Sequence, residues 1–391
     1  MNVILIFAVF SFAVYCHALS SQEEWNNFKF QFNKNYKDID EENHRMQIFL
    51  ENKAVIDRHN AKYKRGLVTF EMGMNQYGDR SQIEFESDLL GIDEADGIRL
   101  DALITRAEKP EGSLPHRVST YYTVRFDAEN STAVPKTDPA PKPLSVFDGF
   151  VRLMKMLFRL SMDVVETFKE TNEIEDWDES VDWQRRGAVT PAKDQGVCGS
   201  CWAFSAAGAL ESHQFIKTGK LTELSVQNLI DCTTGPDYTN LGCSGGIMDA
   251  SFKYVFDNSG IAKEIDYPYE KKNGTCRYED WMSSASCSGY IEFSGGEHLR
   301  EAIRDRGPVS VVLDARTIEF RFYKSGIYIS KRCSDWSTNH AVLAVGYGRK
   351  DDDGYWLIKN SWGPAWGENG FSKISNRRSC GINKYGIYPL V

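Results

Sequence analysis

The sequence predicts an α+β protein, and two segments of the chain carry this prediction. Residues 201–218 (CWAFSAAGALESHQFIKT) are rich in good helix formers, contain no proline and are followed by Gly219, a residue typical of helix ends. Residues 339–348 (NHAVLAVGYG) contain an apolar run that is typical of a buried strand. The combination favours a fold in which helices and a sheet pack together.

The chain begins with a segment that we interpret as a cleavable signal peptide, residues 1–18. Residues 3–15 (VILIFAVFSFAVY) are apolar but too short to span a bilayer, and Ala18 fits a small-residue cleavage site. A membrane anchor is the alternative, but no other part of the chain offers roughly 18 uninterrupted apolar residues. A signal peptide indicates the secretory pathway, and the glycosylation sequons at Asn130 and Asn273 fit that route.

Residues 19–90 are predicted to form a small helical domain. Six of its residues are spaced by 4, 4, 3, 4 and 4 positions, so they lie on one stripe of a helix. The six are Glu41, Arg45, Phe49, Asn52, Ile56 and Asn60. From the stripe alone, an ordinary amphipathic helix is an equally good interpretation.

Residues 91–176 are interpreted as a linker and insertion that is removed when the protein matures. Residues 127–145 carry four prolines among small and polar residues, which indicates an extended linker. Residues 148–170 (DGFVRLMKMLFRLSMDVVETFKE) are predicted to form an amphipathic helix. We expect its apolar face to dock on the rest of the chain, with binding to a membrane surface or a partner as the alternative.

Cys201 has the surroundings of a reactive thiol. A cysteine attacks a carbonyl carbon as its thiolate, which needs a positive environment. Ser200 is a candidate N-cap for a helix over 201–218, so Cys201 would lie at the positive end of the helix dipole. Thiol pKa values fall to roughly 3.5–7.5 in such positions.

His340 is the candidate base for this thiol, and Asn360 is the candidate group that orients the base. His340 opens the predicted strand, and Asn360 lies in the run YWLIKNSWG at 355–363, where its side chain could accept the imidazole N–H. Taken singly, a buried core histidine and a loop asparagine are the alternative interpretations. The spacing of these residues from the run around Cys201 favours the chemical role.

The run CGSCW at 198–202, a histidine 139 positions after Cys201 and the run NSWG at 360–363 together resemble the papain and cathepsin L family of cysteine proteases. Further runs resemble the cathepsin L branch in the same order: GPVSVVLDA (307–315), YKSGIY (323–328) and CGINKYGIYP (380–389). The resemblance implies a papain-like peptidase domain at 177–391. Its fold would have a helical left subdomain and a β-barrel-like right subdomain that meet at a cleft.

The same resemblance implies the role of each catalytic residue. Cys201 would be the nucleophile and His340 its general base, which then protonates the leaving amine. Asn360 would orient His340. The side-chain amide of Gln195 and the backbone N–H of Cys201 would stabilise the oxyanion, and removing one such donor typically lowers turnover by 10² to 10³.

Substrate-binding positions follow from the resemblance as well. The run CSGGIM at 243–248 resembles the family's substrate-pairing edge, whose glycines let an extended peptide approach the backbone closely. The second subsite should accept a hydrophobic residue. Tyr385 departs from the cathepsin L branch, where this position is usually small, so we expect a short pocket that favours Val or Leu over Phe. The residues expected to line the second subsite are Ile247, Met248, Val312, Thr338 and Tyr385. The other expected substrate-binding residues are Gly245, Gly246, Asn339 and Trp362.

The stripe at 41–60 resembles the ERFNIN motif of cathepsin L-type propeptides. A second motif of such propeptides, GxNxFxD, is resembled by Gly73, Asn75, Tyr77 and Asp79, with Tyr in place of Phe. The resemblance implies an inhibitory propeptide whose following segment lies in the cleft in reverse orientation to substrate.

We expect maturation near Asp176–Asp178, promoted by acid. If Asp79 and Glu41 pair with cations such as Arg45, their folded pKa values are depressed. The stability that they contribute is then lost as the pH falls through those values.

The nine cysteines divide into one in the leader, the candidate nucleophile and seven others, so at least one stays unpaired. The resemblance implies the bridges Cys198–Cys243, Cys232–Cys276 and Cys333–Cys380, with Cys287 free. A metal site is the competing interpretation, but Cys198 and Cys201 form the only CxxC spacing. We therefore expect no metal and no cofactor.

Net charge and family resemblance together limit the expected partners. The net charge of −9 and a pI near 5.4 argue against nucleic acid. We expect protein and peptide substrates, the chain's own propeptide and, by resemblance, cystatin-type inhibitors, and we expect a monomer in a lysosome-like compartment or outside the cell. The expected function is that of a cysteine endopeptidase made as a zymogen. The alternatives to it are a catalytically inactive binding protein and an exopeptidase. The latter is disfavoured because no histidine lies between Cys232 and Tyr290 to form a cleft-blocking loop.

Overall fold

The computed structural model describes residues 21–90 and 180–391, which belong to one compact unit. The predicted signal peptide at 1–18, the whole insertion at 91–176 with its helix at 148–170, and the expected maturation site near Asp176–Asp178 lie outside the described residues, as does Asn130.

The N-terminal part is helical, as the spacing of its residues predicts. A helix at 21–31 precedes α2 (Ile39–Tyr63), which contains all six residues of the stripe. Asp38 caps α2 by accepting a hydrogen bond from the N–H of Glu41 (2.9 Å). Phe49, from the stripe, packs on Trp25 and Phe28 of the first helix, so these two helices share one small aromatic core.

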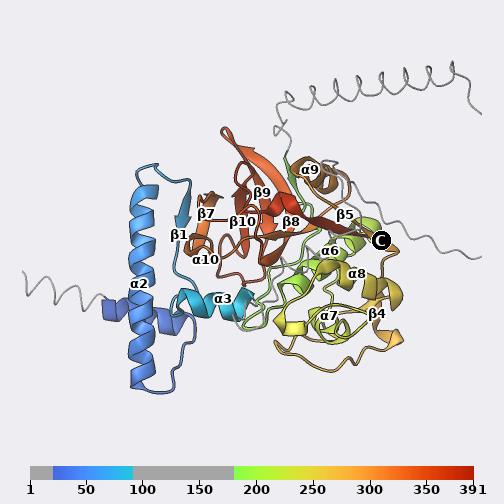
Figure 1. Ribbon diagram of the computed structural model, residues 1–391, viewed down its shortest axis with the longest axis horizontal. Coiled ribbons are helices and arrows are strands. Elements are labelled where there is room, and N and C mark those ends of the chain that lie inside the picture. Colours follow the sequence, from blue (N-terminus) through green and yellow to red (C-terminus); the bar gives the residue numbers. More distant parts are fainter. Residues whose placement is uncertain (1–20, 91–179) are drawn as a thin grey trace, which may run out of the picture. The chain divides into compact units, whose positions relative to one another are not determined.

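The N-terminal part continues with β1 (Phe70–Met72) and α3 (Gln82–Leu90). The start of α3 is a capping box, because Ser81 Oγ accepts from the N–H of Glu84 (3.2 Å) and Glu84 accepts from the N–H of Ser81 (2.8 Å). Figure 1 shows β1 beside β7 (Tyr323–Tyr328), with α2 along its outer side.

The helical half of the remaining chain is built around α6 (Cys201–Thr218), whose bounds agree with the predicted helix. Gly219 ends it in the left-handed conformation at φ 73°. The prediction that Ser200 caps α6 with its side chain is wrong, because Ser200 Oγ instead bonds Tyr269 Oη (2.8 Å). Around α6 lie α7 (Val226–Cys232), η1 (Gly242–Ser244), α8 (Met248–Asp257), β3 (Ile261–Ala262), η2 (Asp280–Met282) and β4 (Ser283–Ala285).

The other half is an open sheet in the order β1-β7-β10-β9-β8-β6-β11-β5, with β2 paired to β8. β8 (His340–Lys350) includes the predicted strand and is buried over its first nine residues. The fold class is thus confirmed, although these strands do not close into a barrel. The remaining elements are β2 (Val181–Asp182), β5 (Gly289–Phe293), α9 (Gly296–Asp305), β6 (Val309–Leu313), α10 (Ile318–Arg321), β9 (Asp353–Lys359), β10 (Phe371–Ser375), η3 (Ile382–Lys384) and β11 (Gly386–Leu390).

The N-terminal part extends this sheet by one strand. β1 pairs antiparallel with β7, with Phe70 opposite Gly326 and Met72 opposite Tyr323. Three disulfides brace the fold with the pairing that the resemblance implies: Cys198–Cys243, Cys232–Cys276 and Cys333–Cys380. Cys201 and Cys287 are buried free thiols.

Candidate active site

Cys201 lies at the first turn of α6, and the residue is only 7% exposed. Burial raises the pKa of this thiol above its ordinary value, although the backbone N–H groups of Ala341, Trp202 and Cys201 itself act in the opposite direction. The expectation of a lowered pKa is therefore wrong for this form of the chain, because loss of solvent outweighs the helix dipole.

The candidate base for this thiol, His340, is neutral. His340 begins β8, adjacent to Ala341, and is fully buried. Its Nε2–H donates to Asn360 Oδ1 (2.8 Å), which leaves Nδ1 as the unprotonated nitrogen, and Nδ1 has no hydrogen-bond partner among the described residues. Burial lowers the pKa of His340 to about 4, against a smaller opposite effect of Asn360.

Two tryptophans cover this histidine. The ring of Trp362 stacks on the imidazole of His340 with centroids 4.7 Å apart, and Trp366 packs edge-on against Trp362 at 5.4 Å. Both tryptophans are fully buried, so the His340–Asn360 hydrogen bond lies in a dry environment.

The side-chain amide of Gln195 is held in one orientation. Its Oε1 accepts from Ser361 Oγ (2.6 Å), which leaves Nε2 to donate to the carbonyls of Cys198 (3.0 Å) and Leu89 (3.0 Å). Leu89 lies in the last turn of α3, where carbonyls have no partner within the helix. The predicted oxyanion donor therefore already holds a carbonyl oxygen of the N-terminal part. Sequence reasoning missed Ser361, and its place directly after Asn360 was the available signal.

The predicted substrate-pairing edge has the backbone that close approach requires. Gly245 adopts φ 117° and has open space where a Cβ would lie, whereas a Cβ on Gly246 would come within 2.7 Å of Trp202 and 2.5 Å of Asn240. Ile247, half-buried, donates its N–H to Asn240 Oδ1 (2.7 Å). A side chain at Gly246 would thus displace the edge.

The predicted second-subsite residues are only partly shown to meet. Met248 and Val312 share a buried cluster with Cys201, and Tyr385 packs against that cluster. Thr338 and Asn339, just before His340, are also buried, and Asn339 Oδ1 accepts from the N–H of Ala315 (2.8 Å).

Tyr385 brings in two carboxylates that sequence reasoning missed. Its hydroxyl donates to Glu292 Oε1 (2.8 Å) on β5, and Glu292 raises the pKa of Asp249, the second residue of α8. Burial is the main cause for both acids: it raises the pKa of Asp249 to about 6 and that of Glu292 above its ordinary value. No local pattern pointed to them, because β5 and α8 are far apart in the sequence.

The N-terminal part binds the other half of the chain through its second predicted motif. Gly73 donates its N–H to the carbonyl of Phe322 (2.9 Å), and a Cβ there would come within 2.9 Å of Lys324. Asn75 Nδ2 donates to the carbonyl of Arg321 (2.8 Å). These contacts explain why a glycine and an amide stand at these positions.

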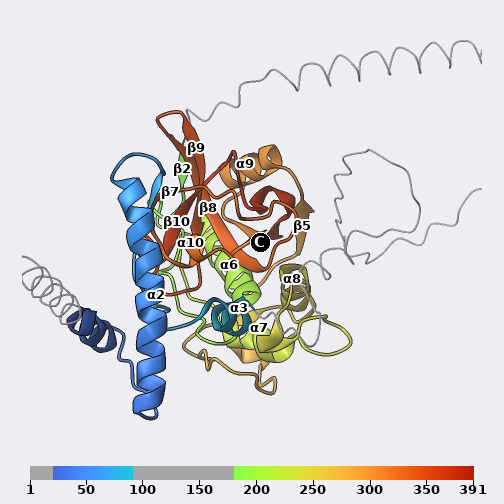
Figure 2. The ribbon, with the colours of Figure 1, turned by 60° about the vertical axis from the view of Figure 1, so that its left-hand side comes forward.

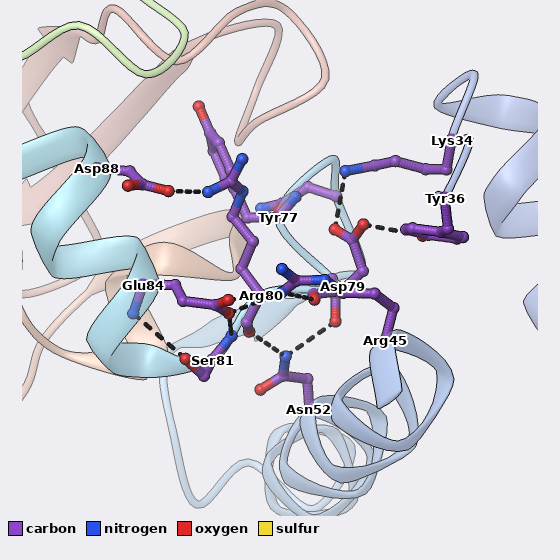
Figure 3. A network of polar contacts seen from close by, with 12 residues as sticks. Lys34, Tyr36, Arg45, Asn52, Tyr77, Asp79, Arg80, Ser81, Glu84 and Asp88 are labelled. Carbon is purple, nitrogen blue, oxygen red and sulfur yellow. Dashed lines mark hydrogen bonds and ion pairs between the residues drawn. The ribbon is translucent and has the colours of Figure 1, made fainter. Parts of the chain in front are cut away.

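Asp79 and Arg45 join the helices of the N-terminal part (Figure 3). Asp79 accepts from Lys34 Nζ (2.8 Å) and Tyr36 Oη (2.9 Å), so Lys34 rather than Arg45 is its cation. Arg45 binds Glu84 (2.7 and 2.8 Å) and lies 3.8 Å from Glu41. Both acids thus lie beside a cation as expected, but Asp79 pairs with Lys34 in place of Arg45, and Arg45 also pairs with Glu84.

Residues 177–390 match the family described as Papain family cysteine protease, and residues 25–85 match the Cathepsin propeptide inhibitor domain (I29). Digestive cysteine proteinase 2 of Homarus americanus is 36% identical over 376 residues, covering 95% of this chain and 96% of the relative. Cathepsin L-like peptidase of Aedes aegypti is 37% identical over 375 residues, with 95% and 93% covered. The solved structure of digestive procathepsin L 3 from Tenebrio molitor larval midgut is similar with a TM-score of 0.70 and 35% identity, over 95% of this chain and 99% of that one.

The chain therefore belongs to the papain family of cysteine proteases. It is a cathepsin L-like protease made with an inhibitory propeptide domain, which at residues 25–85 includes α2, β1 and the start of α3. Among residues 21–90 and 180–391, no helix is long and apolar enough to cross a membrane, and no group of three potential metal ligands is found.

Proposed function

We propose that residues 177–391 form a cysteine endopeptidase that is released from a zymogen and hydrolyses peptide bonds through an acyl-enzyme. His340 Nδ1 takes the thiol proton, and Cys201 Sγ then attacks the carbonyl carbon of the substrate. The oxyanion accepts from Gln195 Nε2 and the N–H of Cys201. His340 returns the proton to the leaving amine, and a water molecule that it activates then hydrolyses the thioester.

One observation carries the proposal: Gln195 Nε2 holds the carbonyl of Leu89 while His340 Nδ1 has no partner among the described residues. In the proposal, the Leu89 carbonyl oxygen occupies the place of a substrate's oxyanion, and His340 Nδ1 keeps the free lone pair that a general base needs. A catalytically inactive binding protein would not need this arrangement.

We also propose that the second subsite prefers Val or Leu over Phe. Tyr385 is bulky, and its hydroxyl is tied to Glu292, so it is held in one position. If Tyr385 shortens the pocket, Tyr385→Ala should admit Phe at this subsite. A peptide library in which Phe dominates the wild-type preference, or a preference that Tyr385→Ala leaves unchanged, would contradict the proposal.

The proposed chain organisation has four parts: a signal peptide at 1–18, an inhibitory propeptide at 19–90, a removed insertion at 91–176 and the peptidase domain. We propose that the protein enters the secretory pathway and works as a monomer, either in an acidic lysosome-like compartment or after secretion. Its proposed inhibitors are cystatin-type proteins. Its proposed glycosylation sites are Asn130 and Asn273. Asn273 is exposed, which glycosylation requires.

The test is to incubate the purified zymogen and its Cys201→Ala variant at pH 4.5. Activity is followed with a Leu-Arg fluorogenic peptide, and the products are identified by mass spectrometry. We expect activity from the wild type alone and a product that starts near Asp176. If both folded proteins stay inactive even after an added protease removes the propeptide, the proposal is wrong.

A further inference from the structure

Arg321, the last residue of α10, is fully buried, and within the described part of the chain its side-chain hydrogen bonds all go to the propeptide. Its Nη2 donates to the backbone carbonyls of Tyr77 and Arg80, whereas Nε and Nη1 have no partner among the described residues. The guanidinium also lies over two rings, Phe85 of the propeptide at 5.0 Å and Phe322 at 4.6 Å. A cation of the peptidase domain is therefore covered by a peptide segment that gives it only neutral acceptors.

The charges that act on Arg321 belong to the propeptide. Burial lowers its pKa to about 9; Asp79 and Glu84 act to raise it, and Arg80 acts to lower it. Neither acid forms an ion pair with Arg321, because Asp79 binds Lys34 and Glu84 binds Arg45.

The nearest acids in the peptidase sequence are also engaged. Glu319 pairs with Arg332 (2.9 Å), and Asp314 pairs with Arg316 (2.8 Å). When the propeptide leaves, Arg321 therefore loses its acceptors and keeps no carboxylate partner from these neighbours.

Ring contacts connect the neighbour of Arg321 in the sequence to His340 of the proposed catalytic pair. Its neighbour Phe320 packs edge-on against Trp362 at 5.5 Å, and Trp362 stacks on His340. In both ribbon views α10 and α8 lie on opposite sides of α6 (Figures 1 and 2). Since α8 begins at Met248 of the predicted second subsite, Arg321 lies on the side expected to hold the substrate residues that follow the scissile bond.

We propose that Arg321 of the mature enzyme is a specificity-determining residue that binds a carboxylate in the leaving part of the substrate, a role that rests on the function proposed above. The propeptide already places two backbone acceptors on Nη2, so a peptide chain reaches the guanidinium. A carboxylate matches its planar fork better than two carbonyls do and replaces the missing counter-charge. The carboxylate belongs either to an Asp or Glu side chain or to the C-terminus of a short product.

The test uses mature enzyme and internally quenched peptides that differ only after the scissile bond. Each of the first three positions there carries Asp, Asn or Lys in turn. We expect kcat/KM to be about tenfold higher for Asp than for Asn at one position, and lowest for Lys, because a hydrogen-bonded charge contributes about one order of magnitude. This ratio should fall in 0.5 M NaCl.

Arg321→Met should bring the Asp/Asn ratio close to one, and Arg321→Lys should retain part of it. A peptide that ends at the favoured position is tested as free acid and as amide, and a preference for the acid identifies the C-terminal carboxylate as the ligand. The Leu-Arg fluorogenic peptide, which has no amino-acid residue after the scissile bond, is the reference substrate to which the activity of each of the three enzymes is normalised. If the wild-type enzyme fails to cleave that substrate, the proposed catalytic function is wrong. If the wild-type enzyme cleaves it but shows an Asp/Asn ratio near one at all three positions, only the role of Arg321 is wrong.

Discussion

Glu84 in the propeptide and Glu292 beneath Tyr385 are the same residue type, yet their pKa values are shifted in opposite directions. Burial acts to raise the pKa of Glu84, but hydrogen bonds from Ser81 and Arg45 outweigh it, so the pKa lies below the ordinary value. Glu292 accepts a hydrogen bond from the neutral Tyr385 hydroxyl, and there burial dominates and raises the pKa. A partly buried carboxylate keeps its charge only where cations or N–H groups replace water.

The same difference separates the two regions to which these residues belong. The proposed catalytic centre holds its groups neutral: burial raises the pKa of Cys201 and lowers that of His340. The propeptide is held together by charged pairs, Lys34 with Asp79 and Arg45 with Glu84. Acid should therefore weaken the charged pairs of the propeptide. The thiol of Cys201 and the imidazole of His340 should stay neutral while this happens.

The first prediction concerns a charge that exists only during the reaction. Gln195→Ala should lower kcat by about 10² to 10³, because the oxyanion loses a fixed N–H donor. The measurement is kcat of the mature enzyme with a fluorogenic peptide, and Gln184→Ala, at an exposed position, is the matched control. A kcat within about threefold of the wild type would show that Gln195 only binds Leu89.

The second prediction is that removal of the propeptide activates the thiol. At pH 6 the alkylation rate of Cys201 by iodoacetamide should rise about 10²-fold on maturation, since regained solvent and the helix dipole both favour the thiolate. Mass spectrometry of the alkylated zymogen and mature enzyme gives the two rates, with the buried thiol of Cys287 as internal control. Equal rates would mean that burial by the propeptide is not what keeps Cys201 protonated.

The third prediction uses the carboxylate pair behind Tyr385. The pKa of Asp249 is raised, so the stability that it contributes is present below the unfolded pKa near 4 and is lost as the pH rises through about 6. Asp249→Asn should therefore stabilise the mature domain at pH 7.5 by up to about 3 kcal/mol and change little at pH 4. Thermal unfolding at both pH values measures this, and Asp257→Asn at the other end of α8 is the control. Equal effects at the two pH values would contradict it.

Elements and candidate site residues could be predicted from the sequence where they depend on local patterns or on motifs. The bounds of α6, the stripe on α2 and the strand that opens at His340 follow from periodicity and composition, and resemblance supplied the disulfide pairing. Sequence reasoning failed for the cap of α6, because a tertiary contact with Tyr269 takes the hydroxyl of Ser200.

It also failed for contacts between elements that are distant in the chain. Glu292 meets Tyr385 through the pairing of β5 with β11, and Arg321 meets Tyr77 only when the propeptide docks. Neither pair has a spacing that a sequence pattern could reveal. The pKa of Cys201 was misjudged for a related reason: a helix start is visible in the sequence, whereas the burial of the thiol is not.

The last prediction has the smallest effect and tests the charged region directly. Glu84→Gln keeps an acceptor for the capping box but removes the charge that Arg45 binds. The folded pKa of Glu84 is depressed, so its contribution is present above the unfolded pKa near 4.3 and is lost as the pH falls through the folded value. The side chain of Glu84 is 35% exposed and that of Arg45 is 22% exposed, so screening limits the effect of the pair to less than about 1 kcal/mol. Zymogen activation at pH 6 should be roughly threefold faster in the variant, and the two rates should converge at pH 3. Glu23→Gln, at an exposed position, serves as control, and a variant that activates faster by the same factor at pH 3 and pH 6 would show that the lost charge is not the cause.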